Sequence, residues 1–340
     1  MPANARLLWL PLLASLLLIS LLSIVTGPLA IEPLAGLKGV LAWAAQSQSP
    51  DLLPHEQLVI SNVRLPRTLL AIAIGALMAQ CGAVMQGLFR NPLADPGIIG
   101  VSSGAALGAA IFIVLFPNAG EFAVPFAAFA GGLVTTLAIY RLAHSRNGTS
   151  VTMLLLAGVA ISALTGSGIG FLTYIADETA LRDLTLWQMG SLSAARWHSI
   201  ALCFVALVIL AWQFQRQAAA LNALLLGEAE ARHLGIEVEK LKIKLIMLTA
   251  FGVGIAVAAA GMIGFVGLVV PHLVRMMIGP DHRTLLPLSA ALGAAILLLA
   301  DLGARTWMAP AEMPVGLVTA ILGAPFFLAL LLNQRNRLGG

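Results

Sequence analysis

Charged residues are scarce in this sequence: Asp, Glu, Lys and Arg together make up 10% of the 340 residues. A soluble domain normally carries about 25% charged residues, because its surface must face water. Hydrophobic residues account for 59% of the chain and its mean hydropathy is +0.95. The scarcity of charge therefore excludes a soluble globular protein and predicts an integral membrane protein.

Cysteines and nucleotide-binding motifs are also few or missing. The two cysteines, Cys81 and Cys203, lie within apolar runs, which argues against a disulfide framework and against a metal site. The chain contains no GxxxxGK[ST] segment, so it does not bind ATP through a Walker motif. Its net charge of +4 is spread along the chain and gives no sign of nucleic-acid binding. We expect no catalytic residues, no metal and no permanently bound cofactor.

Long apolar runs dominate what is present. A helix needs about 20 apolar residues to cross the hydrocarbon core, and these runs are continuous rather than alternating, which favours helices over a β-barrel. Nine runs are close to this length, and a shorter tenth, residues 264–277, contains Pro271. The nine lie near residues 7–27, 66–88, 98–116, 122–143, 152–175, 198–215, 243–261, 285–304 and 314–333. We predict an all-α membrane protein of about ten spans, with residues 1–340 in a single transmembrane domain and the first run retained as an uncleaved span.

The distribution of lysine and arginine predicts the orientation. With ten spans and a cytoplasmic N-terminus, thirteen of the 19 basic residues lie in the cytoplasm, as the positive-inside rule expects. These are Arg6, Arg90, Arg141, Arg146, Arg216, Arg232, Lys240, Lys242, Lys244, Arg275, Arg283, Arg335 and Arg337. Both termini are then cytoplasmic, and residues 216–243 form the longest cytoplasmic loop.

Four segments spread along the chain resemble one transporter family. They are residues 64–110, GEAEARHLGI (227–236), GMIGFVGLVVPHLVRMMIGPDHRTLLPLSA (261–290) and MPVGLVTAILGAPFFLALLL (313–332). Together they resemble the FecCD/BtuC-like permease subunits of ABC importers for haem, iron–siderophores and cobalamin. The resemblance implies a type II ABC importer permease fold in the bacterial inner membrane. It also implies a homodimer, two cytoplasmic ATPase subunits that bind ATP-Mg, and a periplasmic substrate-binding protein.

Residues 221–235 are amphipathic and charged, although long apolar runs lie on both sides. In the family, the cytoplasmic loop between the sixth and seventh spans docks as short helices into a groove on the ATPase. Docking of a helix in a groove requires an apolar face and a complementary polar rim. We expect these residues to supply it: Leu221, Leu224, Leu225, Gly227, Glu228, Glu230, Arg232, His233, Leu234 and Gly235. The two glycines would break the segment into short helices. The alternative is a solvated amphipathic loop on the membrane surface.

Arg64, Arg67 and Arg305 lie at the outer ends of predicted spans. In the family, arginines at these matching positions meet acidic residues of the binding protein. A guanidinium group suits this role because it binds a carboxylate with two hydrogen bonds. One alternative is snorkelling of the side chains to the membrane interface. Another is local pairing, since Asp301 lies one helical turn from Arg305.

Small residues crowd the fifth predicted span. The family places this span and the tenth along a channel at the dimer interface, so we expect Gly158, Ser162, Gly166, Ser167 and Gly170 to line the translocation path. Close packing against neighbouring helices is the alternative.

Two further positions match the cytoplasmic gate of the family. One is the turn that contains Asn91 and Leu93, and the other immediately precedes LLLAG. Relatives can carry a small polar pair at the second position, whereas this chain has Val151 and Thr152. This departure leaves the gating role of the second position open.

The substrate is predicted from resemblance alone. RNPLADPGIIGVSSGAALGA (90–109) and LTLWQMGSLSAARW (184–197) most resemble haem-type permeases, so we predict haem as the transported substrate, with ferric siderophores and then cobalamin as alternatives. An ion-coupled secondary carrier is a rival from another class, but the chain lacks an intramembrane series of acids and bases. A membrane anchor without transport activity is a third possibility.

Overall fold

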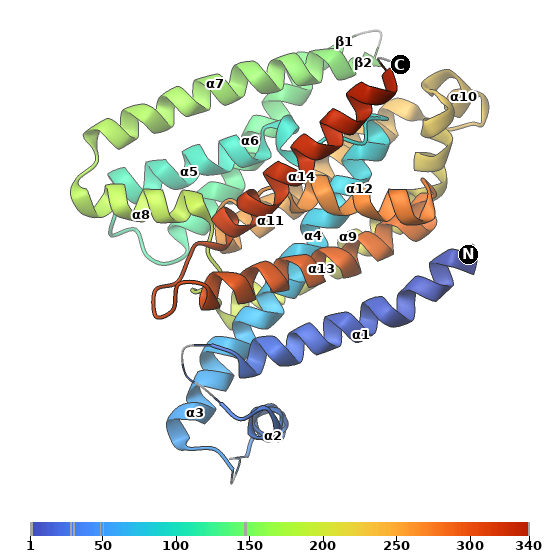
Figure 1. Cartoon of the computed structure of the whole chain (residues 1–340). Helices are drawn as coiled ribbons and strands as arrows, with labels where there is room; N and C mark the ends of the chain where they lie inside the picture. Colours follow the sequence, from blue (N-terminus) through green and yellow to red (C-terminus); the bar gives the residue numbers. More distant parts are fainter. Residues whose placement is uncertain are drawn as a thin grey trace.

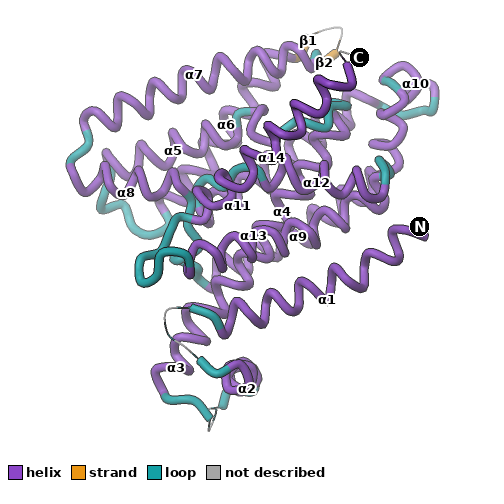
Figure 2. The backbone as a smooth tube through the Cα atoms, viewed as in Figure 1, coloured by secondary structure: helices purple, strands orange, loops and turns teal. Residues whose placement is uncertain are grey.

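The computed structural model describes residues 3–338 apart from 28, 30, 48, 50, 146 and 147. Arg146, one of the basic residues used above to predict orientation, lies outside the described residues, as do the side chains of Arg6, Arg335 and Arg337. The described chain is almost entirely helical (Figure 2). Its one sheet is a two-stranded antiparallel pair, β1 (His144–Ser145) with β2 (Gly148–Thr149). The prediction of an all-α protein is therefore confirmed.

Ten apolar helices correspond to the ten predicted spans. Within the described residues, seven are long and apolar enough to cross a membrane and three are shorter. The long ones are α1 (Ala3–Val25), α4 (Leu65–Leu88), α6 (Ala123–Ala143), α7 (Val151–Ile175), α9 (Trp197–Leu226), α11 (Val238–Ala260) and α13 (His282–Thr306). The shorter ones are α5 (Val101–Leu115), α12 (Val266–Ile278) and α14 (Val315–Leu338), whose apolar part ends at Ala329. The short run with Pro271 is thus a helix of its own, α12.

Helix α4 occupies the centre of the bundle, where α9, α11, α12 and α13 pack around it. Gly75 lies against the backbone of Gly293 in α13, and Gly82 lies against the backbone of Gly267 in α12. A Cβ atom at either position would collide with a carbonyl oxygen. Small residues at these crossings let the helices approach closely, and such packing is what holds membrane helices together.

Helices α7, α14 and α1 lie at the edge of the bundle, and each packs on different inner helices (Figure 1). Helix α7 packs over α5 and α6, α14 packs on α12 and α13, and α1 packs on α13. Both termini lie at the end of the bundle that also carries β1–β2 and α10 (Glu228–His233), called here the α10 end. The opposite end carries α8 (Glu178–Met189) and is called the α8 end.

Short elements complete the connections at the two ends. Helices α2 (Pro33–Ala44) and α3 (Pro54–Val59) follow α1, and the π-helix η1 (Ile60–Arg64) leads from α3 directly into α4. Trp43, at the end of α2, stacks on Trp197 at the start of α9, with ring centroids 5.1 Å apart. At the α10 end, the 3-10 helix η2 (Pro96–Ile99) joins α4 to α5.

Candidate coupling and transport sites

Helix α10 is a short, partly exposed helix held between two glycines with positive φ. Gly227 has φ +129° and Gly235 has φ +83°, values that residues with a Cβ rarely adopt. The chain therefore breaks at both glycines, as the sequence predicted. Arg232, His233 and Leu234 point into solvent, and 65% of Leu234 is exposed.

The apolar face predicted from Leu221 and Leu224 is not available to a partner. Helix α9 continues to Leu226, so the connection to α11 is shorter than the predicted loop of residues 216–243. Leu221 is fully buried and Leu224 is 1% exposed, because this extension of α9 packs against α4 and α13. Leu225 is half-buried, and Leu226 is the exposed leucine of this turn.

Ion pairs that were not predicted from the sequence hold α10 to its neighbours. The Nζ atom of Lys242 lies 2.8 Å from Glu228 of α10 and 3.2 Å from Glu239, and it donates a hydrogen bond to the Thr149 carbonyl oxygen at 3.0 Å. Lys242 is 3% exposed. A carboxylate oxygen of Glu239 accepts the N–H of Thr149 at 2.8 Å. The spacing of Glu239 and Lys242, three apart on a helix, was the available sequence signal.

The end of α9 is tied to α13 by a second polar cluster. Asn222 Nδ2 donates to Asp281 Oδ1 at 2.6 Å, and Asn222 Oδ1 accepts the backbone N–H of His282 at 2.8 Å. Asp281 caps α13 by accepting the N–H of Arg283 at 3.0 Å. Burial opposes ionisation of Asp281, but these hydrogen bonds and the charge of Arg283 outweigh it, so the pKa of Asp281 lies below its usual value.

The three arginines predicted to contact a binding protein are buried near the α8 end. Arg64, Arg67 and Arg305 are only 2–3% exposed. Arg67 Nε lies 2.8 Å from Asp301 Oδ1, and its Nη1 lies 2.6 Å from Glu312 Oε2. Arg305 Nε lies 3.1 Å from Asp301 Oδ2. We call Arg67, Asp301, Arg305 and Glu312 the charge cluster.

Backbone carbonyl groups and a hydroxyl group accept further hydrogen bonds from these arginines. Arg64 Nη1 donates to the carbonyl oxygens of Ile24 and Val25 at 2.9 and 2.8 Å, and Arg305 Nη2 donates to Ser23 Oγ at 2.8 Å. The three guanidinium groups therefore have partners within this chain, and their contact with a binding protein stays a prediction. The arginines lie at the ends of spans, as predicted. The segment after α1 and the connection from α13 to α14 fold over them. The alternative pairing of Asp301 with Arg305 is confirmed.

The small residues of α7 divide into two groups. Gly158 lies against the Ile98 carbonyl oxygen, and Ser162 Oγ lies 3.3 Å from Ser103 Oγ, so both fix α7 to the bundle. Gly166 and Gly170 have open space where a Cβ would lie, and Ser167 is exposed. A role in the translocation path stays a prediction for all five residues.

The outer surface of α7 also carries large apolar side chains. Val159, Leu164, Phe171 and Tyr174 are between 64% and 87% exposed. In a protein that spans the membrane, such a surface requires lipid or another subunit to cover it.

The two predicted gate positions lie at the α10 end. Asn91 Oδ1 accepts the N–H of Leu93 at 2.9 Å, which closes the turn after α4. Val151 and Thr152 form the first turn of α7, where Ser150 is the N-cap. Because Gly158 of α7 contacts Ile98 of η2, the two positions belong to adjoining structures. Their gating role stays a prediction.

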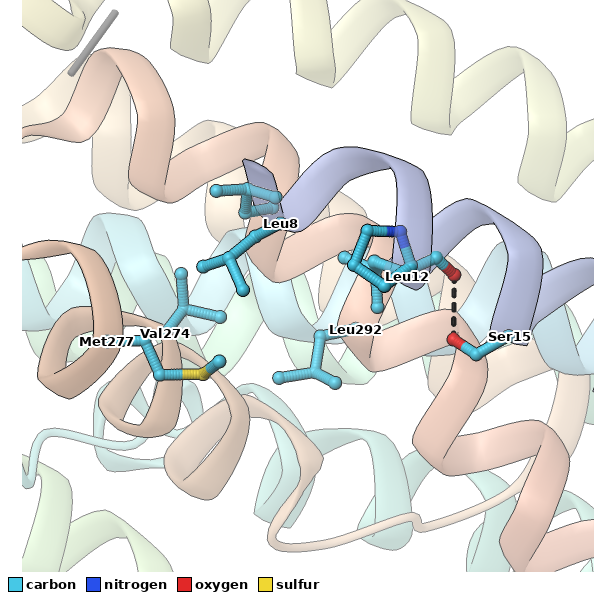
Figure 3. A pocket seen from close by; sticks show the side chains of 8 residues that line it. Leu8, Leu12, Ser15, Val274, Met277 and Leu292 are labelled. Carbon is cyan, nitrogen blue, oxygen red and sulfur yellow. Dashed lines mark hydrogen bonds between the residues drawn. The ribbon is translucent and has the colours of Figure 1, made fainter. Parts of the chain in front are cut away.

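A crevice beside α1 differs in character from the sites above (Figure 3). It is almost entirely apolar, and its one polar side chain, Ser15, donates to the Leu12 carbonyl oxygen at 2.8 Å. The lining consists of Leu8, Pro11, Leu12, Ser15, Val274, Met277, Leu288 and Leu292. These residues offer no charge with which to recognise an anionic chelate, so the crevice is not a candidate substrate site.

Residues 15–333 match the model of the FecCD transport family. The chain belongs to this family. It is therefore a multi-pass permease of the ABC-transporter type.

Individual relatives support the same assignment. The chain is 47% identical over 283 residues to the hemin transport system permease protein HmuU of Yersinia pestis, covering 82% of this chain and 84% of that protein. It is 43% identical over 281 residues to the cobalamin import permease BtuC of Halobacterium salinarum, covering 83% and 75% of the two chains. It is 39% identical over 326 residues to the vitamin B12 import permease BtuC of Vibrio vulnificus, covering 96% and 93%.

Solved structures show the same fold. A structure described as an inward-facing metal-chelate type ABC transporter superposes with a TM-score of 0.84 at 34% identity, covering 95% of this chain and 98% of that chain. PsaBC from Streptococcus pneumoniae superposes with a TM-score of 0.59 at 18% identity and shows likeness of fold alone.

Proposed function

We propose that this chain is the permease subunit of an ABC importer that carries haem into the cytoplasm by alternating access. The observation that carries the proposal is the 47% identity to a hemin permease over more than four fifths of both chains. The chain itself performs no chemistry and holds no resident cofactor. ATP-Mg acts on the partner ATPase, and haem is the transported substrate.

The assembly that we propose assigns a partner to each exposed region. Two ATPase subunits contact the α10 end, where Glu230, Arg232, His233 and Leu234 are accessible. A second copy of the chain covers the exposed face of α7, and a substrate-binding protein approaches the α8 end. The α10 end then faces the cytoplasm of a bacterium, with both termini on that side of the inner membrane.

Cobalamin is the second candidate substrate, because the permeases that share 39–43% of their residues with this chain are named for it. Cobalamin and haem are both large chelates of a transition metal, so one permease architecture can carry either. Ferric siderophores are the third candidate substrate, because their importers also belong to this family.

The proposal is tested with the purified chain and its ABC ATPase in proteoliposomes. The binding protein is added empty or loaded with haem, cobalamin or a ferric siderophore, and ligand entry and ATP hydrolysis are followed together. We expect haem to enter only with ATP and the binding protein. Entry of cobalamin or siderophore in place of haem would overturn the substrate but keep the importer. Entry without ATPase would overturn the importer.

A further inference from the structure

We propose that Lys242 is a positioning residue that transmits the movement of α10 to the start of α7. The inference rests on the proposed function, because it assigns α10 to contact with the ATPase and α7 to the translocation path. The physical connection between α10 and α7 consists of side chains of α11.

The connection begins at the joint before α10. Gly227 has a positive φ and separates α10 from α9, whereas the end of α9 is fixed to α13 through Asn222 and Asp281. Helix α10 also packs on α9, so the proposal requires α10 to rotate at Gly227 while the end of α9 stays in place. Glu228, the first residue of α10, contacts Lys242 Nζ at 2.8 Å.

The connection continues from Lys242 to a single residue, Thr149. Lys242 donates to its carbonyl oxygen at 3.0 Å, and Glu239 accepts its N–H at 2.8 Å. Side chains of α11 thus hold both backbone polar groups of Thr149. The next residue, Ser150, is the N-cap of α7 and accepts the N–H of Met153 at 3.4 Å.

Burial makes Lys242 suited to this role. An ion pair that is shielded from water keeps its strength and its geometry, whereas an exposed pair is screened and mobile. Lys242 is 3% exposed, and Glu228 and Glu239, whose side chains are 31% and 32% exposed, both direct an oxygen to it. Arg232 is 56% exposed and lies 3.6 and 3.9 Å from the same two glutamates, too distant to replace the hydrogen bonds. The movement of α10 therefore reaches α7 through Lys242.

Lys240 provides a matched control. It lies two residues away, its side chain is 78% exposed, and it pairs with Glu237. We compare Lys242→Met with Lys240→Met in the complete transporter, measuring ATP hydrolysis and substrate uptake on the same vesicles. Lys242→Arg tests for rescue, because an arginine can donate to the same three acceptors.

The expected result is a loss of coupling rather than a loss of ATPase activity. For Lys242→Met we expect uptake to fall at least about tenfold, since a buried hydrogen-bonded charge has been removed from the moving connection. ATP hydrolysis should stay within about twofold of the unmodified transporter, and Lys240→Met should change neither, as is usual for an exposed pair. Lys242→Arg should recover part of the uptake. Unchanged uptake for Lys242→Met, or a parallel loss of uptake and hydrolysis, would overturn the proposal.

A second measurement does not depend on transport. Hydrogen exchange is followed at the Thr149 amide in the full chain, for Lys242→Met and for Glu239→Gln, which keeps the lysine. We expect faster exchange at Thr149 in both variants and no change in Lys240→Met. If the chain moves no haem but this pattern is found, the proposed function fails while the connection stands. Slow exchange in both variants would refute the connection whatever the substrate.

Discussion

Asp301 shows at the scale of one residue how this molecule accommodates charge in an apolar interior. Its side chain is fully buried, and it faces two arginines, Arg67 and Arg305, that are themselves buried. Glu312, which is 39% exposed, adds a second carboxylate to Arg67. A buried charge is tolerated only when paired and hydrogen-bonded, so removal of one partner costs more than the pair contributes.

We predict that Asp301→Asn strongly destabilises the chain. The substitution keeps the shape of the side chain but leaves Arg67 and Arg305 without their shared counter-charge. The expected loss is about 3–5 kcal/mol, the range for breaking a buried ion pair. Glu121→Gln is the control, because Glu121 and Arg196 form an exposed pair whose loss should cost no more than about 1 kcal/mol. Denaturant or thermal unfolding in detergent measures both, and equal losses would contradict the role of burial.

Asp281 should give the stability of the chain a dependence on acid pH. Its pKa is lower in the folded protein than its ordinary value of 3.8, so its stabilising contribution is present above that value and is lost as the pH falls through the folded pKa. Asp281→Asn lacks this contribution. The difference in melting temperature between the two proteins should therefore be constant near neutral pH and shrink as the pH falls below about 4. A difference that stays constant over this range would show that the carboxylate charge is not involved.

At the scale of helices, the glycines of α4 determine how closely α12 and α13 approach it. We predict that Gly82→Ala destabilises the protein, because its Cβ would meet the backbone of Gly267 and force α4 and α12 apart. Gly166→Ala is the matched control on α7, where the same methyl group enters open space. Alanine favours a helix over glycine by about 1 kcal/mol, so this control should be neutral or slightly stabilising. Thermal unfolding distinguishes the two, and a harmless Gly82→Ala would contradict the close approach.

The sequence was informative about helices and less so about what covers their ends. Nine apolar runs near span length and a shorter tenth predicted the ten helices, and the positive φ of Gly227 and Gly235 agrees with their predicted role as breaks. The extension of α9 to Leu226 was missed, because apolar content alone does not show whether a leucine beyond the span packs inward. Lys242 was read as one of many cytoplasmic charges. Its burial depends on Thr149, 93 residues away, and no local pattern reports such a contact.

The burial of Arg64, Arg67 and Arg305 was also not predictable from the local sequence. A guanidinium group at the end of a span can face a partner, the membrane interface or its own chain, and the sequence permitted all three. In this structure Arg67 pairs with Glu312, in the connection from α13 to α14, and Arg64 donates to carbonyl oxygens in the last turn of α1. These groups are distant in sequence, so their approach is a property of the folded bundle.

At the scale of the whole molecule, the arrangement of the helices predicts which regions share a side of the membrane. Cys81 and Cys203 are both fully buried, so a membrane-impermeant thiol reagent should react only with cysteines that are introduced. We predict that Glu230→Cys on α10 is labelled from the cytoplasmic side and Thr179→Cys on α8 from the opposite side. Labelling of right-side-out and inverted vesicles checks this. Reaction of both variants from the same side would contradict the arrangement.

The contact between Arg305 and Ser23 has a consequence for the biogenesis of the protein. The two residues are 282 positions apart, so the first helix enters the membrane long before the ribosome has made the residue that fixes it. During synthesis Ser23 and Arg67 lack these partners until α13 has been made, because α13 contains both Arg305 and Asp301. The last fifth of the chain therefore supplies the partners of Ser23 and Arg67 in the first fifth, and a nascent chain that stops before α13 lacks both of these partners.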